Sequence, residues 1–130
     1  MRKVLSLFFF LTACAHAAPG TTHTISSSGF TFSPDSIAIA PGDSVRFVLA
    51  LLHNAAQVTK ETWNANDTAW NGGFWVPFGG GTIAISDTGI HYYVCQNHAP
   101  MGMKGIILVR APAGPPNSIS VECVADRDGN

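Results

Sequence analysis

The chain has 130 residues, enough for one domain of ordinary size. Charged residues make up 12% of it and hydrophobic residues 46%, which excludes a disordered chain, a coiled coil and a long solvated helix. The formal net charge is −1, and loss of Arg2 and Lys3 with an N-terminal leader leaves five of the seven basic residues against eight acidic ones. Such a chain offers no basic surface, so we expect no nucleic-acid partner.

The N-terminus has the pattern of a secretory signal peptide. Two basic residues precede an apolar run that ends at residue 13, and this run is too short for a membrane-spanning helix of about 20 residues. The motif Ala15-His16-Ala17 predicts cleavage of a leader of residues 1–17. The motif Leu11-Thr12-Ala13-Cys14 resembles a bacterial lipobox, which predicts a leader of residues 1–13 and a lipid anchor on Cys14. Both alternatives place the domain outside the cytoplasm, in the periplasm or the extracellular space, as a soluble or a membrane-tethered protein.

Between residues 22 and 110 the sequence predicts short β-strands separated by turns, and no helix. Residues 44–51 alternate apolar and polar side chains, which is typical of a half-buried strand, and Pro41-Gly42-Asp43 predicts a turn before it. The expected strands span about residues 35–40, 44–51, 82–86, 90–95 and 105–110. Short strands at fairly even spacing predict an all-β sandwich or barrel.

We place the folded domain at residues 20–111, followed by a proline-rich tail at 112–130, where three prolines break any further strand. Residues 61–81 lack a strand pattern and contain all three tryptophans. This segment is predicted to be a long loop, and loops of this length are often functional. Its tryptophans either cap one end of the core or form an aromatic rim near a binding site.

Four residues carry metal-binding chemistry. Cys95 is followed by His98 three residues later and by Met103 eight residues later, while His53 lies far upstream. Two histidines and a cysteine with a more distant methionine are the ligand set of blue-copper sites. A zinc site would need two further nitrogen or sulfur ligands, and methionine is a poor ligand for zinc. In an exported protein Cys95 has one alternative role, a disulfide with Cys123.

These residues resemble the cupredoxins, and most of all their plastocyanin/pseudoazurin branch. Cys95-x-x-His98 with Met103 and an upstream His53-Asn54 matches the ligand pattern of that family, and residues 98–103 (HAPMGM) are similar to the pseudoazurin loop. The resemblance covers about residues 22–110 except the tryptophan-rich segment. It implies a Greek-key β-sandwich of about seven to eight strands and one type 1 copper ion, Cu(I)/Cu(II), bound by His53, Cys95, His98 and Met103.

The resemblance also implies roles for neighbouring residues. Asn54 is expected to bond the backbone beside Cys95, where Gln96 replaces the usual small hydroxyl residue. Met101 is an alternative axial ligand, because some cupredoxins have a shorter loop. A partner docking surface is expected around the edge of His98, formed by Ala99, Pro100 and Met101.

The function implied is that of a type 1 blue-copper protein that shuttles single electrons between redox proteins. We expect no enzyme activity, because protein side chains fill all four ligand positions. Val94 and Gln96 also rule out the His-Cys-His triplet that joins a blue site to a trinuclear oxidase centre. A copper-holding or delivery module without redox turnover is one alternative, and a metal-free sandwich with a Cys95–Cys123 disulfide is another. We expect a monomer whose partners are redox proteins, in contact with a membrane only through the lipid anchor.

Overall fold

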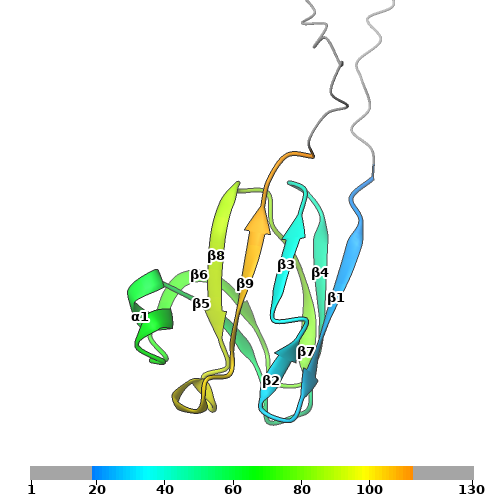
Figure 1. The fold of residues 1–130 in the computed structure, drawn as a ribbon. Helices are drawn as coiled ribbons and strands as arrows, with labels where there is room; N and C mark the ends of the chain where they lie inside the picture. Colours follow the sequence, from blue (N-terminus) through cyan, green and yellow to red (C-terminus); the bar gives the residue numbers. More distant parts are fainter. Residues whose placement is uncertain (1–18, 113–130) are drawn as a thin grey trace, which may run out of the picture.

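The computed structural model describes residues 19–112, and the expected all-β sandwich is confirmed (Figure 1). The leader with Cys14, the tail from residue 113 onward and Cys123 lie outside the described residues. Within them the order of the elements is β1 (Thr22–Ser28), β2 (Thr31–Ser33), β3 (Ser36–Ile39), β4 (Ser44–Val48), β5 (Ala55–Val58), α1 (Lys60–Asn64), β6 (Trp70–Val76), β7 (Gly80–Ala84), β8 (Gly89–Val94), η1 (Ala99–Met101, a 3-10 helix) and β9 (Lys104–Val109).

The strands form two sheets. One has the order β2-β1-β4-β7 and the other β3-β9-β8-β5-β6. Consecutive strands often lie in different sheets, as β4 and β5 do, so the chain repeatedly crosses between the layers. The parallel pairs β1–β4 and β3–β9 follow from these crossings, and the remaining pairs are antiparallel.

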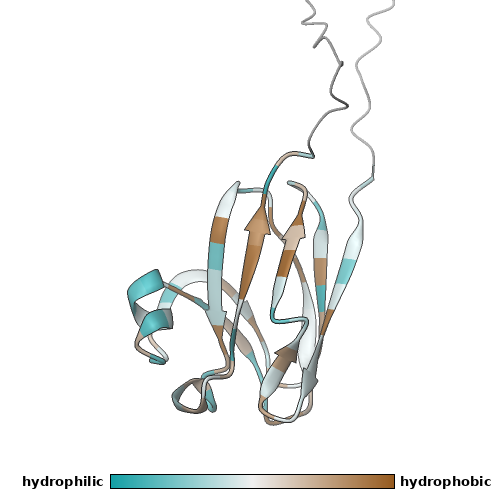
Figure 2. Cartoon of the chain, viewed as in Figure 1, coloured by the Kyte–Doolittle hydropathy of each residue, from teal (hydrophilic) through white to brown (hydrophobic). Residues whose placement is uncertain are grey.

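The core lies between the two sheets and follows the alternation of the strands. In β4 the side chains of Val45 and Phe47 are buried, whereas Arg46 and Val48 point outward. Strand β9 shows the same period of two, and Figure 2 shows its hydrophobic residues in brown. An aromatic group fills the middle of the core, in which Tyr93 packs against Phe32, Phe47 and Phe74.

The prediction of a long loop at residues 61–81 is wrong. The segment contains most of helix α1, all of β6 and the start of β7. The hydroxyl of Thr59 caps the helix by accepting a hydrogen bond from the backbone N–H of Thr62 at 3.2 Å. Strand β6 is an edge strand with mostly exposed residues, two of them glycines, so it shows no alternation of apolar and polar side chains.

The strand predicted at residues 44–51 ends three residues early, at Val48. The chain then turns through residues 49–52 before it enters β5, a strand that the sequence did not predict. His53 and Asn54 therefore lie between β4 and β5, where both side chains are buried. No helix within residues 19–112 has the length and apolar character needed to cross a membrane.

Candidate metal centre

Three of the predicted ligands converge at one end of the sandwich. The sulfur of Cys95 lies 3.4 Å from Nδ1 of His98 and 3.8 Å from Nδ1 of His53. The two Nδ1 atoms are 3.0 Å apart, so the three donor atoms form a small triangle. Cys95 and His53 are buried, whereas His98 is partly exposed. One sulfur and two imidazole nitrogens facing one another can hold a single metal ion.

The loop from Cys95 to Met103 is held by its own backbone. The N–H of Cys95 donates to the carbonyl of Met103 at 2.9 Å, and the N–H of Met103 donates to the carbonyl of His98 at 3.1 Å. The turn is completed by η1 and by Gly102, whose φ of 86° favours glycine. Three of the predicted ligands therefore come from one short loop between β8 and β9, and His53 comes from the β4–β5 connection.

The two methionines of this loop differ in burial. Met103 is completely buried and belongs to the same hydrophobic cluster as Cys95. Met101 is 59% exposed. This difference favours Met103 as the fourth ligand, because an axial thioether has to approach the ion from inside the protein.

The expected bond of Asn54 is present. Its Oδ1 accepts a hydrogen bond from the backbone N–H of Gln96 at 2.9 Å, directly beside Cys95. Its Nδ2 also donates to Oε1 of Gln96 at 2.8 Å, and the indole N–H of Trp75 donates to the same oxygen at 3.2 Å. The sequence indicated an aromatic segment but gave no reason to connect Trp75 with Gln96.

The three residues predicted to form a docking surface differ in their exposure. Ala99 is completely buried, because it packs with Val58 and Val94, so its side chain contributes no surface. Pro100 and Met101 are exposed as expected. Phe30, which the sequence pattern did not indicate, is 53% exposed and lies against His98.

The electrostatics of the centre favour neutral imidazole at His53. Burial, and then the nearby His98, lower the pKa of His53 below its ordinary value. A metal ligand must be deprotonated to donate its lone pair, so this shift favours metal binding. Within residues 19–112 Cys95 forms no disulfide, and Cys123, its alternative disulfide partner in the sequence, lies outside the described residues.

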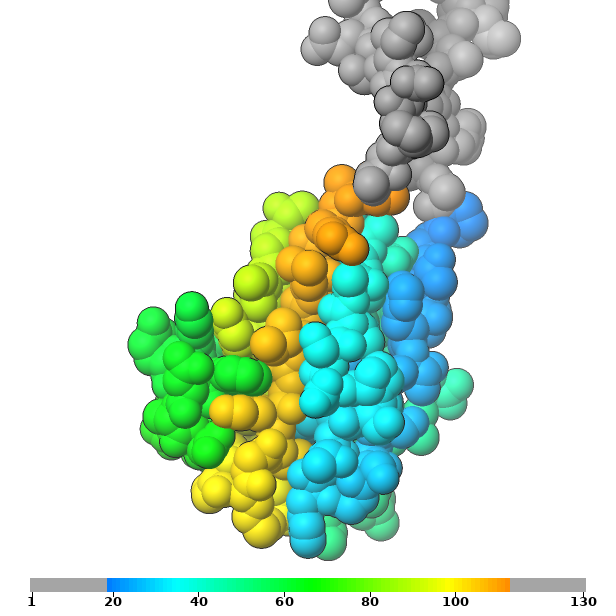
Figure 3. Space-filling model, in the orientation of Figure 1, coloured from blue at the N-terminus to red at the C-terminus, as the bar shows by residue number. Residues whose placement is uncertain are grey.

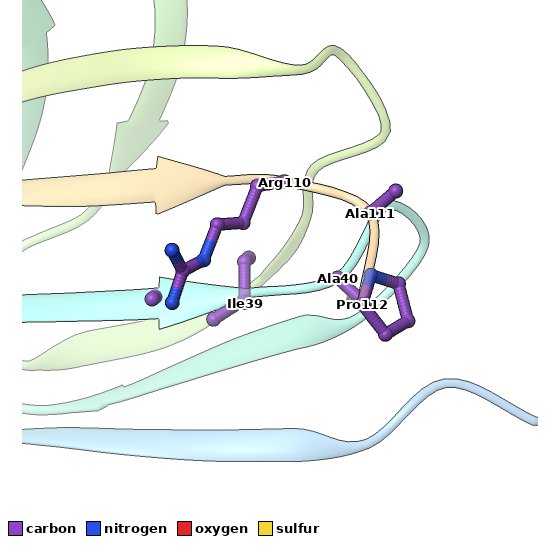
Figure 4. Close-up of a pocket in the computed structure, with 6 residues that line it drawn as sticks. Ile39, Ala40, Arg110, Ala111 and Pro112 are labelled. Atoms are coloured by element: carbon purple, nitrogen blue, oxygen red, sulfur yellow. The ribbon is translucent and has the colours of Figure 1, made fainter. Parts of the chain in front are cut away.

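A separate hollow lies at the opposite end of the sandwich, where β3 and β9 end (Figure 4). Ile39, Ala40, Arg110, Ala111 and Pro112 line it together with Ala38. Arg110 is its only charged lining residue, and the lining has no histidine, cysteine or carboxylate. This hollow therefore offers no metal-binding side chains, in contrast to the end of the sandwich that holds His53, Cys95 and His98.

The donor set fits copper. A thiolate together with two imidazoles suits copper, and a buried thioether completes the soft ligand set of a type 1 site. Calcium and magnesium prefer oxygen ligands, which this triangle does not offer.

Comparisons with known proteins agree with this chemistry. The family model described as "Copper binding proteins, plastocyanin/azurin family" matches residues 20–110. A search of curated proteins finds no match.

Solved structures of plastocyanins and pseudoazurins resemble this fold. The oxidized plastocyanin of the fern Dryopteris crassirhizoma has a TM-score of 0.51 and 20% identity, and the match covers 68% of this chain and 100% of that one. A pseudoazurin from Sinorhizobium meliloti has a TM-score of 0.52 and 27% identity, covering 72% and 76%. A copper-containing nitrite reductase from Thermus scotoductus has a TM-score of 0.52 and 27% identity, and the match covers 69% of this chain but 22% of the enzyme.

Proposed function

The chain belongs to the plastocyanin/azurin family of copper-binding proteins, and we propose that it carries single electrons between redox proteins outside the cytoplasm. Its cofactor is copper, and the proposed type 1 ligands are His53, Cys95, His98 and Met103. When bound, copper supplies one-electron chemistry by alternating between Cu(I) and Cu(II). The observation that carries the proposal is the triangle of donor atoms, with His53 and Cys95 buried and His98 partly exposed.

The protein holds these ligands in place through its own hydrogen bonds. The Cys95–Met103 loop is closed by backbone bonds, and Asn54 ties it to the β4–β5 connection. A preorganised ligand set costs little rearrangement when the charge of the bound ion changes, which suits repeated electron transfer.

We propose no enzyme activity for this centre. Four protein donors leave no position for a substrate, in contrast to catalytic metal sites, which keep one open. The likeness to the nitrite reductase covers 22% of that enzyme, so it concerns one portion of a much larger chain.

An exposed hydrophobic surface surrounds His98 and is suited to partner docking. We call it the apolar rim, and its members are Phe30, Leu51, Leu52, Phe78 and Met101, exposed by 44–83%. The rim residues lie in four connections of the chain. Figure 3 shows two of them, the hairpin of β1 and β2 and the yellow loop around η1, side by side.

None of the rim residues is charged, so the proposed partner is a redox protein with an apolar contact face. Association that depends on apolar contact responds weakly to salt. We therefore expect the second-order rate constant of electron transfer to change little with ionic strength in stopped-flow measurements.

The leader supports a location outside the cytoplasm. Cleavage after residue 17 would release a soluble protein, whereas acylation of Cys14 would tether it to a membrane. Mass spectrometry of the mature N-terminus separates the two cases. We propose a monomer in both.

The proposal is tested by adding Cu(II) to the copper-free protein and recording the visible spectrum. We expect one equivalent to give an intense absorption band, and Cys95→Ser to abolish it. Reversible reduction of this band in a voltammetric cell would support electron transfer. A colourless protein that binds and releases Cu(I) would instead support the copper-delivery alternative.

A further inference from the structure

The side chain of Gln96 connects the ligand loop to edge strand β6. Its Oε1 accepts two hydrogen bonds, from Nδ2 of Asn54 at 2.8 Å and from the indole N–H of Trp75 at 3.2 Å. Gln96 directly follows Cys95, and Asn54 directly follows His53. The group of Asn54, Gln96 and Trp75, which we call the amide clamp, thus joins the two segments that supply the ligands.

The directions of the hydrogen bonds in the clamp are fixed by groups that can only donate. The backbone N–H of Gln96 donates to Oδ1 of Asn54, so Nδ2 of Asn54 has to face the side chain of Gln96. That side chain must then present its oxygen. An indole N–H is also a donor only, so Trp75 selects the same oxygen. Both ends of the clamp favour a single orientation of the two amide groups.

The position of Trp75 is set by the sheet rather than by the loop. Trp75 pairs with Ala56 across β5 and β6, and Ala56 pairs with Val94, the residue before Cys95. The indole is 45% exposed. Leaving part of a large aromatic side chain in water is less favourable than burying it. The N–H edge of this indole nevertheless faces Gln96, the residue next to Cys95.

We propose that Trp75 is a positioning residue for the copper centre, acting through Gln96 and Asn54 on the backbone beside Cys95. Hydrogen bonds and packing around the cysteine sulfur tune the potential of such centres. This inference rests on the proposed function for its copper part. Its structural part, the ordering of Gln96 and Asn54 by the indole, applies to the copper-free protein as well.

The test compares Trp75→Phe with Trp70→Phe. Phenylalanine keeps an aromatic ring but removes the N–H donor in both variants. Trp70 is a matched control because it lies on the same strand, is 53% exposed and donates its indole N–H to the carbonyl of Gly73 rather than to a residue of the clamp.

In the copper-free protein we expect Trp75→Phe to speed amide hydrogen exchange of the Gln96 backbone N–H by roughly tenfold, the upper range for one lost hydrogen bond. Trp70→Phe should leave that rate unchanged. In the copper-loaded protein Trp75→Phe should shift the reduction potential and the visible spectrum, and Trp70→Phe should shift neither. Gln96→Leu, which removes the acceptor, should abolish any further effect of Trp75→Phe.

Equal behaviour of the two tryptophan variants in hydrogen exchange would overturn the clamp. Faster exchange with an unchanged potential and spectrum would overturn its link to copper. Failure of the wild-type protein to form a coloured copper complex would refute the proposed function and the copper part of this inference, whereas the exchange measurement would still decide on the clamp.

Discussion

The ring of Phe30 packs against the ring of His98 in a tilted arrangement, with ring centroids 4.8 Å apart and planes inclined by 42°. Its ring also meets His53 edge-on, at 6.2 Å and 87°. Phe30 occupies the tip of the β1–β2 hairpin, next to Gly29, whose φ of 57° is strained for other residues. A side chain far away in the sequence therefore covers the partly exposed ligand from the solvent side.

This contact predicts that Phe30 contributes to electron transfer between two protein molecules. We expect Phe30→Ala to lower the electron self-exchange rate constant by about tenfold, because an exposed aromatic ring that becomes buried when two molecules dock contributes about 1–2 kcal/mol. Self-exchange needs no knowledge of the natural partner, and NMR line broadening in mixtures of oxidised and reduced protein measures it.

Ile90→Ala serves as the control for Phe30→Ala. Ile90 is 54% exposed, but it pairs with Leu108 near the end of β9, away from the metal centre. An equal loss of self-exchange in both variants would show that general surface hydrophobicity, and not the apolar rim, governs docking.

The burial of the methionines predicts which one binds copper. Met103→Leu should change the visible spectrum and raise the reduction potential, because loss of a sulfur donor removes more stabilisation from Cu(II) than from Cu(I). Leucine fills a similar volume, so the cost in folding should stay below about 1.5 kcal/mol. Met101→Leu, at a side chain that is 59% exposed, should leave the spectrum and the potential unchanged. The opposite result would assign Met101 as the ligand.

The ligand loop could be predicted from the sequence because its spacing is local. Cys95, His98 and Met103 lie within nine residues, and one turn brings them together. The contacts of Phe30 and Trp75 could not be predicted in this way. They join the β1–β2 hairpin and edge strand β6 to the loop, and only the sheet order places these segments beside it.

The fold shows the same division between local and non-local information. Strands with one buried face, such as β4 and β9, alternate and were predicted to within a few residues. Strand β6 is exposed along most of its length, and α1 has five residues with none buried. Neither element has a buried face that would impose a regular spacing of apolar residues, so the sequence pattern of the tryptophan-rich segment wrongly predicts a loop.

Trp63 is the tryptophan of this segment with the clearest structural role. Its indole N–H donates to the carbonyl of Gly105 at 3.1 Å, and the ammonium of Lys104 lies 4.0 Å from the ring centroid. These contacts fasten α1 to β9. We expect Trp63→Phe to lower the free energy of unfolding by about 1–2 kcal/mol, since it loses the hydrogen bond and weakens the cation–π contact. Chemical denaturation measures this loss, and an unchanged copper spectrum would separate Trp63 from Trp75.

The hydrogen bonds that Asp43 accepts from Thr21, His23 and Ala40 are expected to be sensitive to acid. Its carboxylate is buried and accepts hydrogen bonds from Nε2 of His23 at 2.9 Å and from the backbone N–H groups of Thr21 and Ala40 at 2.8 and 3.0 Å. These bonds, with His23 first, lower the pKa of Asp43 below its ordinary 3.8. A carboxylate with a lowered pKa stabilises the folded state above pH 3.8, and this stabilisation is lost as the pH falls through the lowered value.

We therefore expect Asp43→Asn to be less stable than the wild type at neutral pH, because an amide gains no charge-assisted bonds. The difference between the two should shrink as the pH falls below about 4, where the wild-type carboxyl becomes protonated. Denaturation of the copper-free proteins from pH 2 to 7 measures this difference, and both variants keep the same metal ligands. Asp87→Asn, at an exposed carboxylate, is the control. A difference that stays constant over this range would mean that the carboxylate's charge does not stabilise this contact.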